Sequence, residues 1–248
     1  MTQGQSRLEL LRLFLSEKHD PDPFYAALAE RSISGFQFPL QGARVLDLGC
    51  GGGYYGAALK RSGAEVVAAD LAEADVRQAS QRDLSALICD GTRLPFPSGS
   101  FDGVFCSNML EHTPRPELIF DELERVLRPG GWAWVSWTNW YSPWGGHEIV
   151  PLHFLGPHNG LRAWRALFGE PRKNVPFVEL WPTYVGRTIA HVRRRPGLEV
   201  LDVVPRYYPT QRWILRVPVL REVLTWNCLI MLRRTRAELS APVTAKQN

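Results

Sequence analysis

The sequence predicts an α/β fold, a doubly wound and mostly parallel sheet, and two observations lead to it. Apolar runs of strand length alternate with helical or turn segments between residues 43 and 137. This order is typical of parallel βαβ units. A glycine-rich turn follows the first run, in VLDLGCGGGYYG at 45–56. Such a turn after a strand lets the backbone approach a ligand closely.

Seven strands are expected, separated by helices or turns. A helix begins at DPFYAALAER, because Asp22 suits the N-cap and Pro23 the first helical position. Leucines at helical spacing predict an earlier amphipathic helix over 6–18. Further helices are expected over 53–63, 115–131 and 185–197, the second of them stopped by Pro129 and two glycines. The expected strands are 43–49, 65–70, 85–90, 101–108, 132–137, 198–207 and 225–234.

Composition narrows the class of protein. The chain has 248 residues, of which 45% are hydrophobic, enough for a sizeable core in one domain. We find neither a secretory signal nor an apolar run of the roughly 18 residues that span a bilayer. The cysteines lack metal-ligand spacing, and most lie in strand-like runs, so we expect reduced thiols in a cytoplasmic protein. They are Cys50, Cys89, Cys106 and Cys228.

The glycine-rich turn is consistent with either of two alternative ligands. Gly51, Gly53 and Gly56 satisfy G-x-G-x-x-G, which would hold the pyrophosphate of a nicotinamide cofactor in an NAD(P)-dependent oxidoreductase. Read from Asp47, the same stretch satisfies D-x-G-x-G-x-G, through Asp47, Gly49, Gly51 and Gly53. A carboxylate at the strand end would repel a pyrophosphate and attract a cation. The sequence therefore favours a cationic ligand such as S-adenosylmethionine, with its sulfonium and ammonium groups.

Two more carboxylates end the next strands. Asp70 ends the second strand, where an acidic residue can accept hydrogen bonds from both ribose hydroxyls, and NAD would fit there as well. Asp90 ends the third strand, where it can accept from an adenine amino group. Ligands of open α/β sheets bind at the carboxyl ends of the strands, so three successive strand-end aspartates predict one nucleoside site.

These motifs together resemble the class I S-adenosylmethionine-dependent methyltransferases, in particular the small-molecule subgroup called type 11. The resemblance covers residues 43–137. It is carried by VLDLGCGGG, AAD, CDGTRLPFPSGSFDGVFCSNMLEH and ELERVLRPGGW. Beyond it, SWTNWYSPWGGHE and VPVLRE are similar to uncharacterised mycobacterial and other actinobacterial methyltransferases. The resemblance implies an enzyme with a seven-stranded Rossmann-like sheet, an antiparallel last strand and a cap insertion.

We expect a single domain, 1–248, in which the strand–helix rhythm breaks after Trp140 and a segment rich in Gly, Pro, His and aromatic residues follows. N-terminal helices occupy 1–35, the cofactor-binding half 43–140, a substrate-cap insertion 141–181, a C-terminal helix and strands 182–236, and a flexible tail 237–248. By the same resemblance, the methionine part of S-adenosylmethionine contacts Gly49, Gly51, Gly53 and Ser107, with Asp47 near its ammonium and sulfonium groups. Asp70 takes the ribose, Leu71 lies beside the adenine, and Asp90 and Gly91 take the adenine edge.

The candidate catalytic residues are His112 and Glu111, just past the fourth strand. Methyl transfer is an in-line displacement, so a base is needed only when the nucleophile must lose a proton. His112 could serve as that base for a hydroxyl acceptor. The alternative is that His112 only orders its loop.

The insertion supplies candidate residues for the acceptor pocket. They are Trp140, Tyr141, Trp144, His147 and His153. Core packing is the alternative for the tryptophans. His147, Glu148, His153 and His158 match no standard zinc spacing, so no metal is expected.

The C-terminal third is rich in arginine, and a solvated surface is its simplest explanation. Apolar residues among the arginines of RYYPTQRWILRVPVLREVL suggest instead contact with an anionic membrane, at the inner face, or a cap over the pocket. Nucleic acid is disfavoured as a partner, because SNML stands where amino-group DNA methyltransferases carry an N-P-P-Y-like tetrad. We expect a small or lipid-like acceptor methylated at oxygen, and a non-catalytic cofactor-binding adapter remains an alternative.

Overall fold

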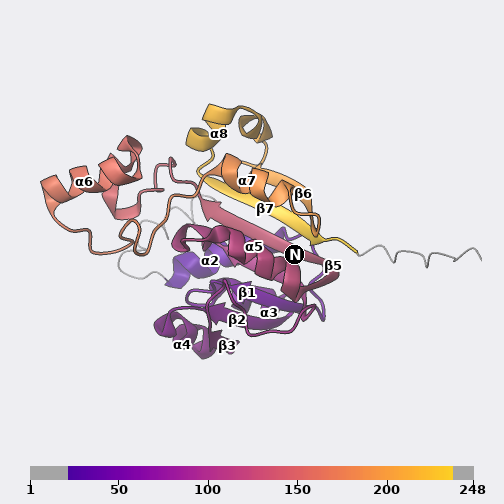
Figure 1. Ribbon diagram of the computed structural model, residues 1–248. Helices are drawn as coiled ribbons and strands as arrows, with labels where there is room; N and C mark the ends of the chain where they lie inside the picture. The colour runs from indigo at the N-terminus through magenta and orange to yellow at the C-terminus, as the bar shows by residue number, and fades with distance from the viewer. Residues whose placement is uncertain (1–21, 237–248) are drawn as a thin grey trace, which may run out of the picture.

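A sheet forms the centre of the molecule (Figure 1), as seen in a computed structural model that describes residues 22–236. The sheet has seven strands. The strand order is β3-β2-β1-β4-β5-β7-β6. Neighbours from β3 to β5 pair in parallel, whereas β7 is antiparallel to both β5 and β6. The expected doubly wound sheet with an antiparallel last strand is confirmed. The strands are β1 Arg44–Leu48, β2 Glu65–Asp70, β3 Ser85–Ile88, β4 Phe101–Ser107, β5 Leu127–Thr138, β6 Leu198–Pro205 and β7 Asn227–Arg234.

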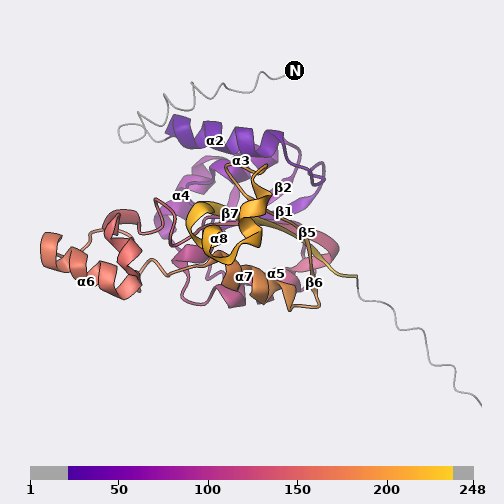
Figure 2. The same ribbon diagram turned by 90° about the horizontal axis from the view of Figure 1, so that it is seen from above.

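Helices cover both faces of the sheet (Figure 2). Helices α2, α3 and α4 lie over one face, and α5 and α7 lie over the other. Short helices follow β4 and β6, and α6 belongs to the insertion. The α-helices are α2 Asp22–Ser34, α3 Tyr54–Arg61, α4 Glu73–Gln81, α5 Pro116–Val126, α6 Pro157–Phe168, α7 Val185–Arg193 and α8 Pro218–Leu224; the 3-10 helices are η1 Leu110–His112, η2 His147–Ile149, η3 Leu152–Leu155 and η4 Arg212–Arg216.

Strand alternation divides the core into two layers. Leu46 and Leu48 of β1 pack with α5 and α7, whereas Val45 packs with α2, α3 and α4. Successive side chains of a strand point to opposite faces. Asp47 therefore shares the α3 face with Val45. Phe105 of β4 also lies on that face.

Two of the differences between predicted and observed element ends concern β3 and β5 of the parallel part of the sheet. Helix α5 ends at Val126 rather than near Gly131, because Leu127 takes an extended conformation and pairs with Phe101 of β4. Strand β5 therefore starts at Leu127, five residues before the predicted start. Strand β3 ends at Ile88, so Asp90 lies in the following loop. The amphipathic helix predicted over 6–18 lies outside the described residues.

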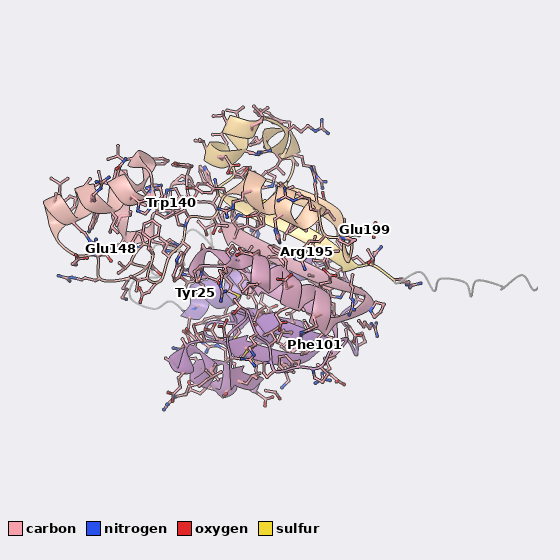
Figure 3. All side chains as sticks on the ribbon, in the orientation of Figure 1. Tyr25, Phe101, Trp140, Glu148, Arg195 and Glu199 are labelled. Carbon is pink, nitrogen blue, oxygen red and sulfur yellow. The ribbon has the colours of Figure 1, made fainter. Side chains whose placement is uncertain are left out.

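The insertion after β5 projects beyond the sheet and carries α6 (Figure 1). Trp140 and Glu148 lie on this side of the molecule, and Phe101, at the start of β4, lies on the far side (Figure 3). The insertion therefore stands at the carboxyl ends of the parallel strands. Among residues 22–236, no helix has both the length and the apolar character to cross a membrane.

Candidate functional site

A cleft of about 1330 Å³ runs along the carboxyl ends of β1, β2, β3 and β4. Ligand pockets usually measure about 300–1,000 Å³, so this cleft has room for a cofactor and an acceptor together. Its floor comes from loops that follow the strands, and its outer wall comes from η1 and the insertion. These lining segments include 48–52, 69–72, 89–92, 107–109, 112–115, 178–179, Asn174 and Trp181.

The glycine loop presents its backbone to this cleft. Gly49 and Gly51 both have positive φ, +69° and +49°, which favours glycine. A Cβ on Gly51 would meet nothing within 4 Å, whereas one on Gly49 would lie 2.7 Å from Cγ of Met109. Gly53 does not line the cleft and packs against Ala79 of α4. Gly49 and Gly51 are thus placed to contact a ligand, while Gly53 joins α3 to α4.

Two strand-end carboxylates line the cleft beside that loop. Asp70 accepts a hydrogen bond from the Gly51 N–H (2.9 Å), which ties the end of β2 to the loop. Asp90 accepts from the backbone N–H and hydroxyl of Thr92, both at 2.8 Å. Leu71, 72% exposed, lies on the wall between them. The structure therefore brings most of the predicted cofactor residues to one wall: Gly49, Gly51, Asp70, Leu71, Asp90, Gly91 and Ser107.

Asp47 does not lie where the sequence analysis predicted, beside the ammonium and sulfonium groups of the cofactor. Its side chain is 2% exposed, and it does not line the cleft. Its Oδ2 lies on the α3 face, 2.8 Å from where a Cβ on Gly56 would stand, and has no hydrogen-bond partner in residues 22–236. Burial raises the pKa of Asp47 to about 7. Asp47 therefore lies behind the glycine loop because its strand position points it toward α3, and direct contact with a sulfonium is not part of this geometry.

The raised pKa of Asp47 makes folding stability depend on pH. From pH 3.8 to about 7 the folded protein keeps a proton that the unfolded chain has lost, so the stability contribution falls as pH rises. Asp47→Asn removes this ionisation. We expect the stability of the variant relative to wild type to increase by about 2–3 kcal/mol between pH 5 and pH 8. Urea unfolding at both pH values measures it, and an unchanged difference would contradict the burial argument.

His112 lines the cleft between the strand ends and the insertion. Its Nδ1 lies 2.8 Å from the carbonyl oxygen of Glu179 in the insertion. A carbonyl can only accept, so Nδ1 carries the proton and Nε2 of the neutral ring carries a lone pair. The His147 ring lies edge-on 5.4 Å away, and burial, followed by the charge of His112, lowers the pKa of His147 to about 4. His147 is therefore neutral at pH 7.

Glu111 supports the site from behind rather than facing the cleft. It is 2% exposed and does not line the cleft. Its carboxylate accepts the Thr138 N–H (3.0 Å), and its carbonyl accepts the Trp181 N–H (2.7 Å). Burial raises the pKa of Glu111, while the charge of His112 opposes this rise. Glu111 thus ties η1 to β5 and to the insertion, and this fixes the backbone that carries His112.

The five predicted acceptor-pocket residues do not line the described cleft. Trp140 and His153 are buried in the insertion, where the Trp140 indole donates to the His153 carbonyl (3.3 Å). Tyr141 packs beside Tyr184, and Trp144 is 54% exposed. His147 contacts the ring of His112 but does not itself line the cleft. The aromatic residues mainly hold the insertion together, since Trp140 forms a small core with Ile149 and Leu180.

A hydrogen-bonded network missed by the sequence interpretation lies beyond Ser107. Arg206, which follows β6, donates to Ser107 Oγ (2.9 Å) and Ser136 Oγ (3.0 Å). It also donates to the Tyr55 hydroxyl (2.7 Å). Tyr55 and Ser107 line the cleft. The sequence offered no local signal for this contact, because Arg206 and Ser107 are 99 residues apart.

The strand order, the glycine loop and the aspartates beside it together define the class of S-adenosylmethionine-dependent methyltransferases. A family model described as a methyltransferase domain matches residues 46–135. An uncharacterised methyltransferase of Mycolicibacterium gilvum is 33% identical over 241 residues, 92% of this chain and 94% of that protein. One from Mycobacteroides abscessus is 32% identical, covering 90% of this chain and 92% of the other. The chain belongs to this methyltransferase family.

A solved structure agrees on the fold. A methyltransferase from Mesorhizobium loti, described as S-adenosylmethionine-dependent, aligns with a TM-score of 0.60 at 24% identity, covering 86% of this chain and 99% of that one. Such a likeness shows the fold alone. The activity and the cofactor follow from the family relationship and the residues of the cleft. The protein is therefore an S-adenosylmethionine-dependent methyltransferase.

The residues present fit this cofactor. Gly51 leaves open space at the loop, and the carboxylates of Asp70 and Asp90 face the cleft from adjacent strand ends, as a nucleoside requires. Asp70 would hold the ribose and Asp90 the adenine edge, while Gly49 and Gly51 would hold the methionine part. When bound, S-adenosylmethionine supplies an electrophilic methyl group.

Proposed function

We propose that this enzyme methylates an oxygen atom of a small or lipid-like acceptor, with His112 as the general base. The observation that carries the proposal is the bond from His112 Nδ1 to the Glu179 carbonyl. This bond selects the neutral tautomer whose Nε2 can take a proton. A hydroxyl acceptor must lose a proton as it is methylated, and His112 lines the cleft that would hold the cofactor.

The other readings of the site are less favoured. In the oxidoreductase reading, Gly56 would be the third glycine of a pyrophosphate loop, but it is buried against Asp47 and does not line the cleft. A non-catalytic adapter would need no base, yet His112 is held in the tautomer that a base requires. Family membership also agrees with methyl transfer.

A lipid-like acceptor, reached at an anionic membrane surface, is supported by the surface around α8. This helix has no buried residue. Trp213 and Val219 are 51% and 72% exposed, and the exposed Arg216 lies between them in sequence. Aromatic and aliphatic side chains among arginines suit a membrane interface. Several other arginines of this third are instead held by carboxylates, such as Arg195 by Asp121 and Glu124.

One experiment tests both parts of the proposal. The full chain is incubated with methyl-labelled S-adenosylmethionine and vesicles of mycobacterial lipid extract containing anionic lipid, and the vesicles are then floated. We expect protein and label to float together, with the label on an ether or ester oxygen. Label that stays in the aqueous phase would indicate a soluble acceptor. Protein that stays below would contradict membrane contact.

A further inference from the structure

Arg206 is a half-buried cation held rigidly next to the cleft. Its backbone N–H donates to the Asn227 carbonyl (2.8 Å), which continues the pairing of β6 with β7. Its guanidinium lies 4.7 Å from the centre of the Trp134 ring, a distance typical of a cation–π contact. Backbone pairing and stacking therefore fix the position of this positive charge.

The charge of Arg206 has only neutral partners. Its hydrogen bonds go to the hydroxyls of Ser107, Ser136 and Tyr55, and within residues 22–236 it makes no ion pair. Some other half-buried arginines are paired, such as Arg195 with Asp121 and Glu124, whereas Arg234, in the described part of the chain, donates only to the backbone carbonyls of Arg125 and Leu127 at the start of β5. A partly desolvated cation is costly without an anion, and such cations are usually paired. Arg206 differs from Arg234 because two of its partners, Ser107 and Tyr55, line the cleft.

The nearest buried carboxylates do not supply that anion. Burial raises the pKa values of both Asp47 and Glu111, and neither contacts Arg206. The charge of Arg206 does act on the neighbouring Tyr207, whose pKa burial raises and Arg206 lowers. S-adenosylmethionine itself brings a positive sulfonium. The carboxylates that line the cleft beside the glycine loop, Asp70 and Asp90, follow β2 and β3 and form no ion pair with Arg206. A fixed cation without an ion pair attracts a negatively charged group.

The sheet order places Arg206 on the side of the sheet away from the predicted nucleoside residues Asp70 and Asp90. The predicted cofactor residues follow β1, β2, β3 and β4, whereas Arg206 follows β6 at the opposite edge. It reaches back across β7 and β5 to touch Ser107 at the end of β4. Arg206 itself is not among the cleft-lining residues, but its guanidinium donates to Ser107 and Tyr55, which are.

We propose that Arg206 binds a carboxylate or phosphate group of the acceptor, so that the substrate of this methyltransferase is an anion. Two guanidinium N–H groups remain for this group after the bonds to Ser107, Ser136 and Tyr55. Arginine suits planar, two-point recognition of such groups. This inference deepens the proposed function. The identity of the bound group as the methyl acceptor rests on that function, whereas the anion site itself does not.

The test uses matched probes on the full chain saturated with S-adenosylhomocysteine. Decanoate, decyl phosphate and decan-1-ol share one apolar chain and differ in charge, and calorimetry measures their binding. We expect at least one of the two anions to bind about tenfold or more tighter than the alcohol, the size of one charge-assisted contact. Arg206→Gln should reduce this preference to within about twofold, and Arg206→Lys should keep part of it. Arg216→Gln, the same change at an exposed arginine, should leave it intact.

Three outcomes would overturn the proposal. One is an anion preference that survives in Arg206→Gln, and another is no anion preference in wild type. The third is that Arg206→Gln weakens S-adenosylhomocysteine tenfold but leaves methylthioadenosine, which lacks the carboxylate, unchanged; the cation would then serve the cofactor. Failure of methyl transfer itself would appear as absent labelled product while the anion preference persists, so the two failures are distinguishable.

Discussion

Replacing His112 by alanine is expected to lower kcat about 100-fold or more, the usual loss when a general base is removed. Affinity for S-adenosylhomocysteine should stay within about twofold, because a base that acts on the acceptor is not one of the residues proposed to hold the cofactor. The measurement is turnover with methyl-labelled S-adenosylmethionine and the labelled acceptor fraction, combined with calorimetry of the product cofactor.

His112→Asn separates a base from an ordering residue. An asparagine amide can still donate to the Glu179 carbonyl, so it keeps the contact with the insertion but has no basic nitrogen. If His112 is the base, Asn and Ala should reduce kcat alike. Recovery of kcat in the Asn variant would mean that His112 only orders the insertion. His191→Ala, on α7, is the control and should change neither quantity.

The second large effect is expected at Gly51. Gly51→Ala adds a methyl group that meets no protein atom within 4 Å and projects into the open cleft. We expect affinity for S-adenosylhomocysteine to fall about tenfold or more, because the loop backbone can no longer approach the ligand. The positive φ adds only about 1–2 kcal/mol of strain, so the variant should fold.

Gly49→Ala is the matched contrast. Its Cβ would stand 2.7 Å from Met109 Cγ, so the substitution overpacks the protein itself and should lower stability by about 1–3 kcal/mol beyond the backbone strain. Urea unfolding and calorimetry on both variants give the two quantities. Unchanged affinity in Gly51→Ala would show that the loop does not contact the cofactor.

The parts of the site that follow from local sequence were predictable. The carboxyl ends of parallel strands meet at one edge of the sheet, so residues placed there by a strand–turn pattern must gather in space. Asp70, Asp90 and the glycine loop gathered for this reason. The antiparallel β7 came from the family resemblance rather than from the pattern of its own residues.

The parts that depend on side-chain direction or distant contacts were not predictable. Asp47 lies at the expected strand end, but alternation along β1 points it toward α3, away from the cleft. The aromatic residues at the start of the insertion were consistent with an acceptor pocket or with core packing. In the structure Trp140 is buried in a small core of the insertion. Arg206 needed the pairing of β6 with β7 before its reach to Ser107 could be seen.

The central claim is that the cleft holds S-adenosylmethionine rather than a dinucleotide, and calorimetric titration of the full wild-type chain tests it most directly. We predict that S-adenosylhomocysteine binds with one site per chain and that NADH and NADPH give no binding heat at the same concentrations. Binding of NADH or NADPH without binding of S-adenosylhomocysteine would contradict the account.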